Sequence, residues 1–350
     1  FIMEFANNYE PEEKSSNHEP NATSVERTVS PTSVQDKTAD SSHGKKSTPA
    51  SPLPAAVQAL RTMDKIISME KETFRFLKLL GEGVSGKVLL SKRAGHDLLY
   101  AIKFVSVLEP FAETEFKIHH YLSGAPQIVP LLGYYRTDSH VASVMPYYRH
   151  GDLYNVIAAG EGSPSPGSFF HDRTAANLIR NMCVSIQSLH HRGVAHFDIK
   201  PENFLCSGKP TSSRKNNLWL CDFGYAARAT YQDRVNDGRV RGSTGYISPE
   251  CTRGINCGPA ADIWSMAAVA HVLLTGHVPF VYEFDQAILA YQRQALPMAL
   301  DPREKHRFVL TARACDFMRR CFSYDTDERM TIDEALTHPW LAWDASSPTP

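Results

Sequence analysis

The hydrophobic and polar positions divide the chain into a polar start and a patterned remainder. From about residue 7 to residue 55, Ser, Thr, Pro, Asn, Glu and Lys dominate, and the few apolar residues show no period. Such a segment cannot bury enough apolar surface to offset its ordering entropy, so residues 1–56 are predicted to form a disordered Ser/Thr/Pro-rich tail. Residues 57–73 are predicted as a lead-in segment with a short amphipathic stretch, and residues 344–350 as a second disordered tail.

Between residues 74 and 145 the apolar positions mostly alternate, as they do along half-buried β-strands. The alternation breaks once at a group of glycines, which predicts strand, turn and strand. Near residue 115 the spacing changes to three and four residues, which predicts a helix reaching Leu122. The expected strands cover residues 74–80, 87–90, 100–105, 128–135 and 141–145. This part of the chain is therefore predicted to form a small antiparallel sheet with one main helix.

After Gly151 the pattern becomes largely helical, with apolar residues three and four positions apart. The expected helices cover residues 174–191, 260–274 and 311–322, and a last helix is expected near residues 336–340. Two insertions rich in small and polar residues, 160–168 and 207–217, are predicted to be solvent loops. The whole pattern predicts an α+β protein in which a larger, mostly helical lobe follows a small sheet lobe.

Composition narrows the class of protein. The chain has 350 residues, of which 42% are hydrophobic, and this is enough for a sizeable core. A net charge of −1 argues against a design for binding nucleic acid or membrane surfaces through overall charge. The longest apolar stretch, at residues 263–274, falls short of the roughly 20 residues that span a bilayer, so we expect a buried core helix and no membrane span.

The seven cysteines are scattered without a Cys-x-x-Cys pair. Neither a zinc site nor a disulfide framework has this spacing, so reduced thiols are expected. The first five residues lack the basic and apolar regions of a signal peptide. Both observations predict an intracellular protein, cytoplasmic or nuclear.

The candidate chemistry is concentrated in two short motifs. Residues 196–203 read His-Phe-Asp-Ile-Lys-Pro-Glu-Asn, and Asp-Phe-Gly follows at residues 222–224. Transfer of a phosphoryl group from a nucleoside triphosphate needs a carboxylate for the attacking hydroxyl, a cation for the migrating group, and an amide and a carboxylate for Mg²⁺. Asp198, Lys200, Asn203 and Asp222 supply these four groups. A His-x-Asp with an Asn five residues later is short enough to be an ordinary turn, so the interpretation depends on further motifs.

Residues 81–88 read Gly-Glu-Gly-Val-Ser-Gly-Lys-Val. Without glycine side chains, the backbone N–H groups of such a loop can close over phosphates. A dinucleotide-binding fold would need a helix directly after the glycines, whereas here the apolar pattern continues as a strand. The residues of this loop predicted to bind the nucleotide are Gly81, Glu82, Gly83, Val84, Ser85 and Gly86.

Two further motifs follow Asp-Phe-Gly along the chain. Ser-Pro-Glu at residues 248–250 resembles the end of an activation segment, and Asp-Ile-Trp at residues 262–264 resembles the start of a central helix. With these motifs the chain resembles a eukaryotic-type protein kinase over about residues 74–343, and Lys200 in Asp-x-Lys-Pro-Glu-Asn resembles the Ser/Thr-specific kinases. The resemblance implies the two-lobed kinase fold, with an N-lobe at 74–145, a hinge at 146–150 and a C-lobe at 151–343.

The resemblance also implies roles in ATP binding. Lys103 would hold the α- and β-phosphates and pair with a helix glutamate, for which Glu115 fits best and Glu113 is the fallback. The gap from Lys103 to Glu115 is shorter than is usual in the family. Val88 and Ala101 would cover the adenine. In the hinge region Met145 would guard the back of the pocket, while the Pro146 carbonyl and the Tyr148 N–H would bond the adenine edge. Asp152 would hold the ribose or a basic substrate side chain, or would simply cap a helix.

In the catalytic loop the resemblance makes Asp198 the base for the substrate hydroxyl and Lys200 the cation on the γ-phosphoryl group, with Asn203 and Asp222 binding Mg²⁺. ATP and Mg²⁺ are thus the implied cofactors. Three structural roles are also implied: Phe223 packs inward, Asp262 tethers the catalytic-loop backbone, and Glu250 forms a buried ion pair with Arg329.

One departure from the family pattern is Phe197, which stands where most kinases have an Arg that clamps a phosphorylated activation-loop residue. We therefore expect activity to depend little on phosphorylation of Thr230, Tyr231, Ser243 or Thr244.

The expected partners are protein substrates with Ser or Thr acceptors. The resemblance implies that the acidic Glu202 and Asp152 give a mild preference for Arg or Lys upstream of the acceptor, and that the bulky Tyr225 after Asp-Phe-Gly favours Ser over Thr. A scaffold without catalysis and a small-molecule phosphotransferase are the alternatives. A scaffold would be expected to lack an essential Lys, Asp or Asn, and none is missing here. Small-molecule phosphotransferases generally lack the motifs at 248–250 and 262–264, which are both present.

Overall fold

The computed structural model describes residues 74–83, 86–93, 95, 97–136, 139–159, 170–208, 217–280 and 310–342, all within the unit Leu53–Pro350. Several predictions lie outside these residues: both tails, the lead-in segment, the loop at 160–168 and most of the loop at 207–217.

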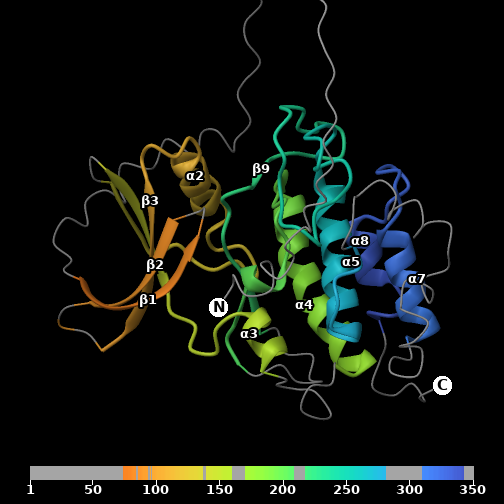
Figure 1. Cartoon of the computed structure of the whole chain (residues 1–350), viewed down its shortest axis with the longest axis horizontal. Coiled ribbons are helices and arrows are strands. Elements are labelled where there is room, and N and C mark those ends of the chain that lie inside the picture. Colours follow the sequence, from red (N-terminus) through yellow and green to blue (C-terminus); the bar gives the residue numbers. More distant parts are fainter. Residues whose placement is uncertain are drawn as a thin grey trace, which may run out of the picture. The chain divides into compact units, whose positions relative to one another are not determined.

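The first part of the described chain is a five-stranded antiparallel sheet with the strand order β1-β2-β3-β5-β4 (Figure 1). Its strands are β1 (Phe74–Gly83), β2 (Gly86–Arg93), β3 (Leu99–Ser106), β4 (Gly133–Arg136) and β5 (His140–Pro146). Helix α2 (Ala112–Leu122) lies beside the sheet, and its Phe116 packs with Val105 of β3 and Tyr134 of β4 in one buried cluster. The predicted sheet with one main helix is confirmed in this part of the chain.

Two strand predictions need correction. Strand β1 does not stop at the first glycine but continues through Gly83. The predicted strand at 128–135 is wrong over its first half, because only Gly133–Arg136 joins the sheet. Ile128 instead forms an isolated bridge with Leu220, and Ile128 and Val129 are at most 1% exposed. An apolar run buried on both sides looks like a strand in the sequence, although here it packs against the helical lobe.

The helical lobe is built around α5 (Pro259–Thr275), which is buried at every position. Proline at its first position and Gly276 in the left-handed conformation after its last residue mark its two ends. The other helices are α3 (Leu153–Ala158), α4 (Asp172–His190), α7 (Ala312–Cys321) and α8 (Ile332–Thr337). The predicted buried core helix is α5. Within the described residues, no helix combines the length and the apolar character needed to cross a membrane.

The end of the last helix differs from the prediction. Helix α8 ends at Thr337, and His338 already has extended backbone with a φ of −62° and a ψ of 139°. Pro339 explains this end, because a proline disfavours helical backbone in the residue before it.

Four short strands were not predicted. Strand β6 (Val194–Ala195) pairs with β9 (Ala227–Arg228), and β7 (Phe204–Cys206) pairs with β8 (Leu218–Leu220). Strands of two or three residues are too short to show a period in the sequence. They nevertheless position the two candidate catalytic motifs, because β6 and β7 flank residues 196–203, and β8 and β9 flank residues 221–226.

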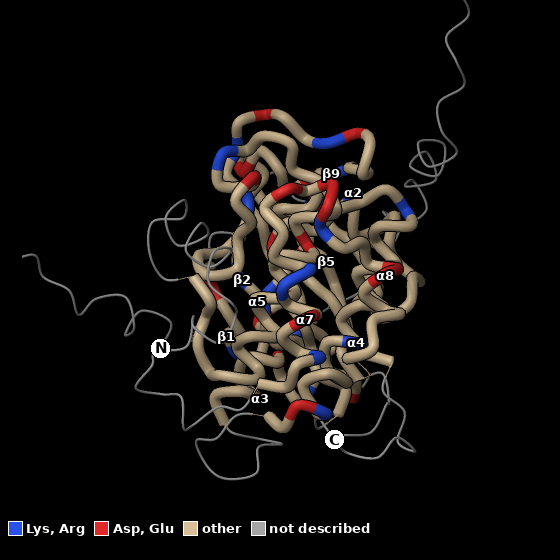
Figure 2. Tube along the Cα trace, turned by 90° about the vertical axis from the view of Figure 1, so that its right-hand side faces the viewer, with Lys and Arg blue, Asp and Glu red and all other residues tan. Residues whose placement is uncertain are grey.

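Figure 2 shows Lys and Arg interspersed with Asp and Glu along the described chain.

Candidate active site

A cavity of about 380 Å³ opens between the sheet and the helical lobe. Val88 of β2, Ala101 of β3 and Met145 of β5 line it from the sheet, and Leu205 of β7 lines it from the helical lobe. The other predicted nucleotide-binding residues that line it are Gly81, Lys103, Glu115, Pro146, Tyr148 and Asp152. Glu82, Gly83 and Gly86 are described but do not line the cavity, and Val84 and Ser85 lie outside the described residues. Leu80, Ser143, Tyr147 and Leu205 also line the cavity and were not predicted.

The return from the glycine loop into β2 requires a glycine. Gly86 has a φ of 110°, and a Cβ atom there would lie 2.1 Å from the backbone oxygen of Phe104. Any side chain would therefore collide with β3 next to Lys103.

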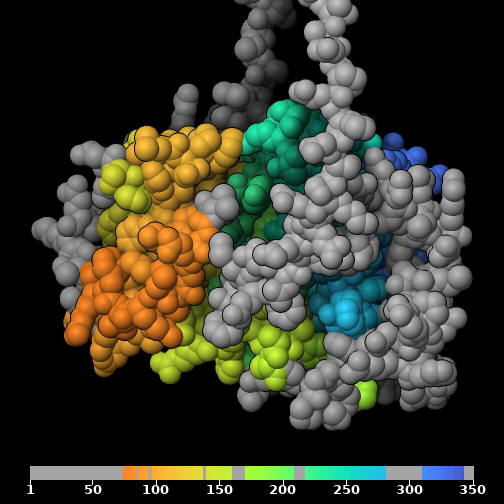
Figure 3. Space-filling model, viewed as in Figure 1, coloured from red at the N-terminus to blue at the C-terminus, as the bar shows by residue number. Residues whose placement is uncertain are grey.

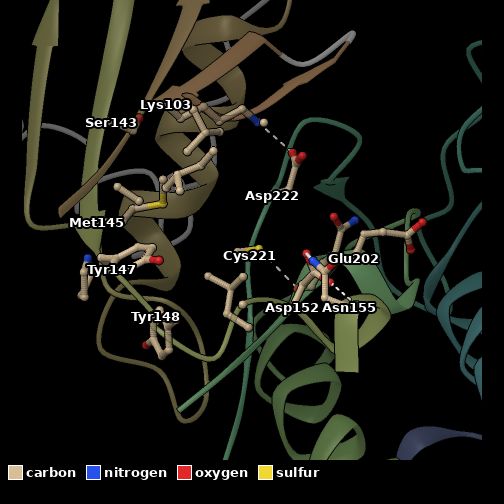
Figure 4. A pocket seen from close by; sticks show the side chains of 18 of the residues that line it. Lys103, Ser143, Met145, Tyr147, Tyr148, Asp152, Asn155, Glu202, Cys221 and Asp222 are labelled. Carbon is tan, nitrogen blue, oxygen red and sulfur yellow. Dashed lines mark hydrogen bonds and ion pairs between the residues drawn. The ribbon is translucent and has the colours of Figure 1, made fainter. Parts of the chain in front are cut away.

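Lys103 holds two carboxylates together in the cavity. Its Nζ lies 2.6 Å from Oε1 of Glu115 and 2.9 Å from Oδ1 of Asp222, and Figure 4 shows it pointing from the sheet toward Asp222. Glu113 instead forms ion pairs with Arg136 and Lys117, so Glu115 is the helix partner of Lys103.

Within this triad the charges of Lys103 and Asp222 stabilise each other, whereas burial and the charge of Asp222 raise the pKa of Glu115 to about 7. Burial alone would lower the pKa of Lys103, but the charges of Asp222 and Glu115 raise it above its usual value. Burial alone would raise the pKa of Asp222, but the charge and hydrogen bond of Lys103 lower it to about 2. At neutral pH, Lys103 is therefore cationic and Asp222 anionic.

The Asp198 carboxylate is held from three directions. Its Oδ2 lies 2.9 Å from Nζ of Lys200 and accepts a hydrogen bond of 3.2 Å from Nδ2 of Asn203. Its Oδ1 accepts a hydrogen bond of 2.7 Å from the Ser243 hydroxyl, which in turn accepts one of 2.6 Å from Lys200. The carboxylate thus has a fixed orientation next to the cavity.

From the sequence, Ser243 is predicted only as a candidate phosphorylation site, and its contact with Asp198 is not. Its contact depends on Gly242, which has a φ of 118° and lies so close to the catalytic loop that a Cβ would be 2.9 Å from the Phe197 oxygen. A Gly-Ser pair shortly before Ser-Pro-Glu was the available signal, but the spacing alone does not reveal the contact.

Asp262, near the start of α5, holds the backbone of the catalytic loop through hydrogen bonds. Its carboxylate is fully buried and accepts hydrogen bonds from the backbone N–H groups of His196, at 2.9 Å, and Phe197, at 2.8 Å. Its Oδ2 also lies 2.9 Å from Nε2 of His190. This confirms the predicted tether and explains how Phe197 is kept in the left-handed conformation, with a φ of 66°.

A row of rings connects the two lobes. The Phe223 ring centroid lies 5.4 Å from that of His196 in the catalytic loop and 4.9 Å from that of His119 in α2. Phe223 is 1% exposed, which confirms the predicted inward packing. His119 was not predicted in this position. Its Nε2 lies 2.7 Å from the Val129 oxygen, and burial lowers its pKa to about 4.

Asn203 and Asp222 both line the cavity. The Asn203 amide nitrogen donates to the Asp198 backbone oxygen at 2.7 Å, which leaves its side-chain oxygen as the group that can face a cation. One carboxylate and one amide oxygen fit Mg²⁺, which is usually held by one or two protein groups together with substrate phosphates.

Asp152 caps helix α3, because its Oδ1 accepts a hydrogen bond of 2.7 Å from the Asn155 N–H. It also lines the cavity together with Glu202, and burial raises the pKa of both carboxyls. The helix cap is thus observed, while a role in substrate binding stays a prediction.

The predicted buried ion pair is confirmed in the helical lobe. The Arg329 guanidinium lies 2.6 Å and 3.1 Å from the two carboxylate oxygens of Glu250, and the Arg329 side chain is fully buried.

Comparison with known proteins agrees with this geometry. The family model "Protein kinase domain" matches residues 74–341. Calcium-dependent protein kinase 34 of Arabidopsis thaliana is 32% identical over 327 residues, which cover 88% of this chain and 58% of that protein. Calcium-dependent protein kinase 26 of Oryza sativa subsp. japonica is 34% identical over 236 residues, which cover 67% of this chain and 40% of that protein. The chain spans about half the length of the curated relatives it matches. The chain belongs to the protein kinase family.

Proposed function

We propose that the protein is a Ser/Thr protein kinase that transfers the γ-phosphoryl group of Mg·ATP to hydroxyls of protein substrates. The observation that carries this proposal is the Asp198 carboxylate, fixed by Lys200, Asn203 and Ser243 beside a cavity that contains the Lys103–Glu115–Asp222 triad. Transfer through a loose transition state requires positioning and charge stabilisation above all, and these groups supply both.

Each group has a role in this reaction. Asp198 orients the substrate hydroxyl and accepts its proton, while Lys200 lies beside Asp198 and stabilises charge on the migrating phosphoryl group. Lys103, positioned by Glu115, holds the α- and β-phosphates. Asn203 and Asp222 would hold Mg²⁺, which neutralises phosphate charge when bound.

The adenine would lie between apolar side chains of both lobes. Val88 and Ala101 cover it from the sheet and Leu205 from the helical lobe, since all three line the cavity. The Pro146 carbonyl accepts from its amino group and the Tyr148 N–H donates to its ring.

For the substrate we propose Ser or Thr acceptors in a basic context. Asp152 and Glu202 are carboxylates at the same cavity, and a basic side chain of the substrate would compensate their partly buried charge. Tyr225, directly after the Asp-Phe-Gly motif, supports a preference for Ser over Thr.

We also propose that activity depends little on phosphorylation of the activation segment. Phe197 is 2% exposed and packs in an apolar cluster with Ile247 and Cys251, so this position offers no cation to a phosphate. An intracellular, cytoplasmic or nuclear location is proposed as well, and the scattered cysteines, which form no Cys-x-x-Cys pair, support it.

The first test is γ-phosphate transfer from Mg·ATP to a basic Ser/Thr peptide, with Asp198→Asn as the comparison and ATP binding measured on both proteins. We expect transfer by the natural protein and its loss in Asp198→Asn with ATP binding retained. ATP binding without transfer by either protein would instead indicate a scaffold. Transfer to a small hydroxyl compound but to no peptide would indicate a small-molecule phosphotransferase.

A further inference from the structure

Helix α2 is contacted near both ends by arginines of the segment that follows the Asp-Phe-Gly motif. The guanidinium carbon of Arg239 lies 3.8 Å from the ring centroid of Phe111, the residue directly before α2. The guanidinium carbon of Arg228 lies 4.0 Å from the ring centroid of Tyr121, the last but one residue of α2. Figure 3 shows the gold atoms of the α2 region bordering the teal atoms of this segment.

Arg239 is held in place by a carboxylate of its own segment. Asp237 accepts hydrogen bonds from Arg239 Nε at 2.8 Å and from the Arg239 backbone N–H at 3.1 Å. Asp237 also pairs with both terminal nitrogens of Arg241, at 2.7 Å and 2.5 Å, and these bonds keep the pKa of its carboxyl well below its usual range. Asp237 therefore remains charged and orients both arginines.

This group is attached to the helical lobe through its backbone. The Arg241 N–H donates to the Cys251 oxygen at 3.4 Å, and the Gly238 N–H donates to the Gly254 oxygen at 3.1 Å. Arg241 is 3% exposed, and its guanidinium carbon lies 5.7 Å from the ring centroid of Phe197. Arg241 thus brings a cation toward the residue that replaces the catalytic-loop Arg.

Arg228 is attached to the helical lobe in a different way. It lies in β9, which pairs with β6 directly before the catalytic loop. The Arg192 oxygen accepts hydrogen bonds of 3.4 Å from both Arg228 and the Tyr121 hydroxyl. Both partners of this ring contact are therefore fixed to the same backbone group.

The contact at the start of α2 has little packing to replace it. A cavity of about 450 Å³ lies beside it, lined among others by Phe111, Thr114, Tyr225 and Arg239. Phe111 is 39% exposed. An arginine over an aromatic ring is attracted by the negative face of the ring, and this attraction needs no phosphate.

We propose that Arg239 and Arg228 are positioning residues that hold the two ends of α2 against the helical lobe, and so keep Glu115 at Lys103 without a phosphorylated activation segment. This inference rests on the proposed kinase function, because Lys103 acts on ATP. The helix contacts themselves can be tested without any activity.

Hydrogen–deuterium exchange of the α2 amides measures the local opening of this helix directly. An exposed cation–π contact corresponds to a change of about fivefold in the opening equilibrium. We expect Arg239→Met and Arg228→Met each to speed exchange in α2 by about fivefold. Together they should speed it about 25-fold, since the contacts lie at separate ends of the helix. Exchange in α4 and α5 should not change.

The matched control is Arg253→Met, because the guanidinium carbon of Arg253 lies 5.9 Å from the ring centroid of Tyr324 in the helical lobe. Unchanged α2 exchange in the double variant, or equal acceleration by Arg253→Met, would overturn the proposal. Phe111→Tyr keeps the ring and should retain natural protection, whereas Phe111→Leu should behave like Arg239→Met.

A kinetic measurement distinguishes positioning from general support. In the double variant we expect the KM for ATP to rise by about fivefold or more, with the KM for the peptide unchanged. Faster α2 exchange with an unchanged KM for ATP would refute the link to Lys103 while leaving the kinase function intact. Absence of transfer by the natural protein, with the expected exchange pattern, would refute the kinase function alone.

Discussion

The backbone N–H of Phe197 donates a hydrogen bond of 2.8 Å to Oδ1 of Asp262, which lies 65 residues further along the chain. Phe197 has a φ of 66°, a conformation that is strained for a bulky side chain and persists only where the surroundings hold it. The central helix thus fixes the backbone on which Asp198 is carried.

Replacing Asp262 with Asn should impair the chemical step more than ATP binding. An amide retains one acceptor but turns an NH₂ group toward a backbone donor, at a site where hydrogen bonds to a charged group contribute about 1.5–3 kcal/mol. We expect kcat to fall by about 10- to 100-fold. Steady-state kinetics check this, with Asp333→Asn as the control, because Asp333 is an exposed carboxylate that also pairs with a histidine. Equal kcat values for the two variants would contradict the tether.

Ser243→Ala should lower kcat by about 10- to 100-fold, because the hydroxyl links Asp198 and Lys200 through two hydrogen bonds to charged groups. Ser243→Thr keeps the hydroxyl and should stay within about threefold of the natural protein. Rates at saturating ATP test both variants. Similar losses in Ala and Thr would point to packing in place of the hydrogen bonds.

Thr244→Ala and treatment with a phosphatase should each leave the transfer rate within about twofold. Thr244 is exposed, and the buried Phe197 gives a nearby phosphate no cation at its position. Ser243→Ala does not test phosphorylation alone, because it also removes the Ser243 hydroxyl that donates to Asp198. A large loss of activity after phosphatase treatment would refute this expectation.

Arg329→Met should lower the free energy of unfolding by about 3–5 kcal/mol, because it leaves the Glu250 carboxylate buried without its cation. Adding Glu250→Leu removes the stranded charge, so the double variant should lose less than the sum of the single losses. Urea unfolding of the four proteins measures this coupling. Additive losses would mean that the ion pair contributes no specific interaction.

Acid should destabilise the protein through two buried histidines. Burial lowers the pKa of His119 and of His271 to about 4, whereas an unfolded histidine titrates near 6.5. The unfolded chain therefore binds more protons between these values, so each stabilising contribution is complete above about pH 6.5 and is lost as the pH falls toward 4. Each histidine accounts for ~3 kcal/mol over this range. Unfolding free energies of His119→Leu between pH 4 and pH 7 should show a smaller slope than the natural protein, and an identical slope would contradict the assignment.

Much of the fold could be predicted because long elements carry a clear period. Helices α4, α5 and α7 begin and end within two residues of their predicted bounds. Ile128 and Val129 were misread as strand because burial on both sides removes the period. Strands β6 to β9 were missed because two or three residues cannot show one.

The site was predictable where a motif carries the chemistry and less so where a contact depends on the folded chain. Lys103, Asp198, Asn203 and Asp222 stand in short motifs, and the structure brings them to one region. Ser243 reaches Asp198 only because the chain returns 45 residues later through Gly242. Likewise, His119 had the spacing of a core residue on α2, and only the folded chain reveals its ring contact with Phe223.

The cavity that contains Lys103 and Asp222 carries two sulfur-containing side chains, Met145 and Cys221. Burial raises the pKa of the Cys221 thiol well above its usual value, and its sulfur donates to the Asn203 oxygen at 3.4 Å. A thiol that stays protonated is a poor nucleophile, so electrophilic inhibitors aimed at it would react slowly. Selective inhibition of this protein is better sought through reversible compounds whose polarisable rings match the soft, adaptable surface of Met145.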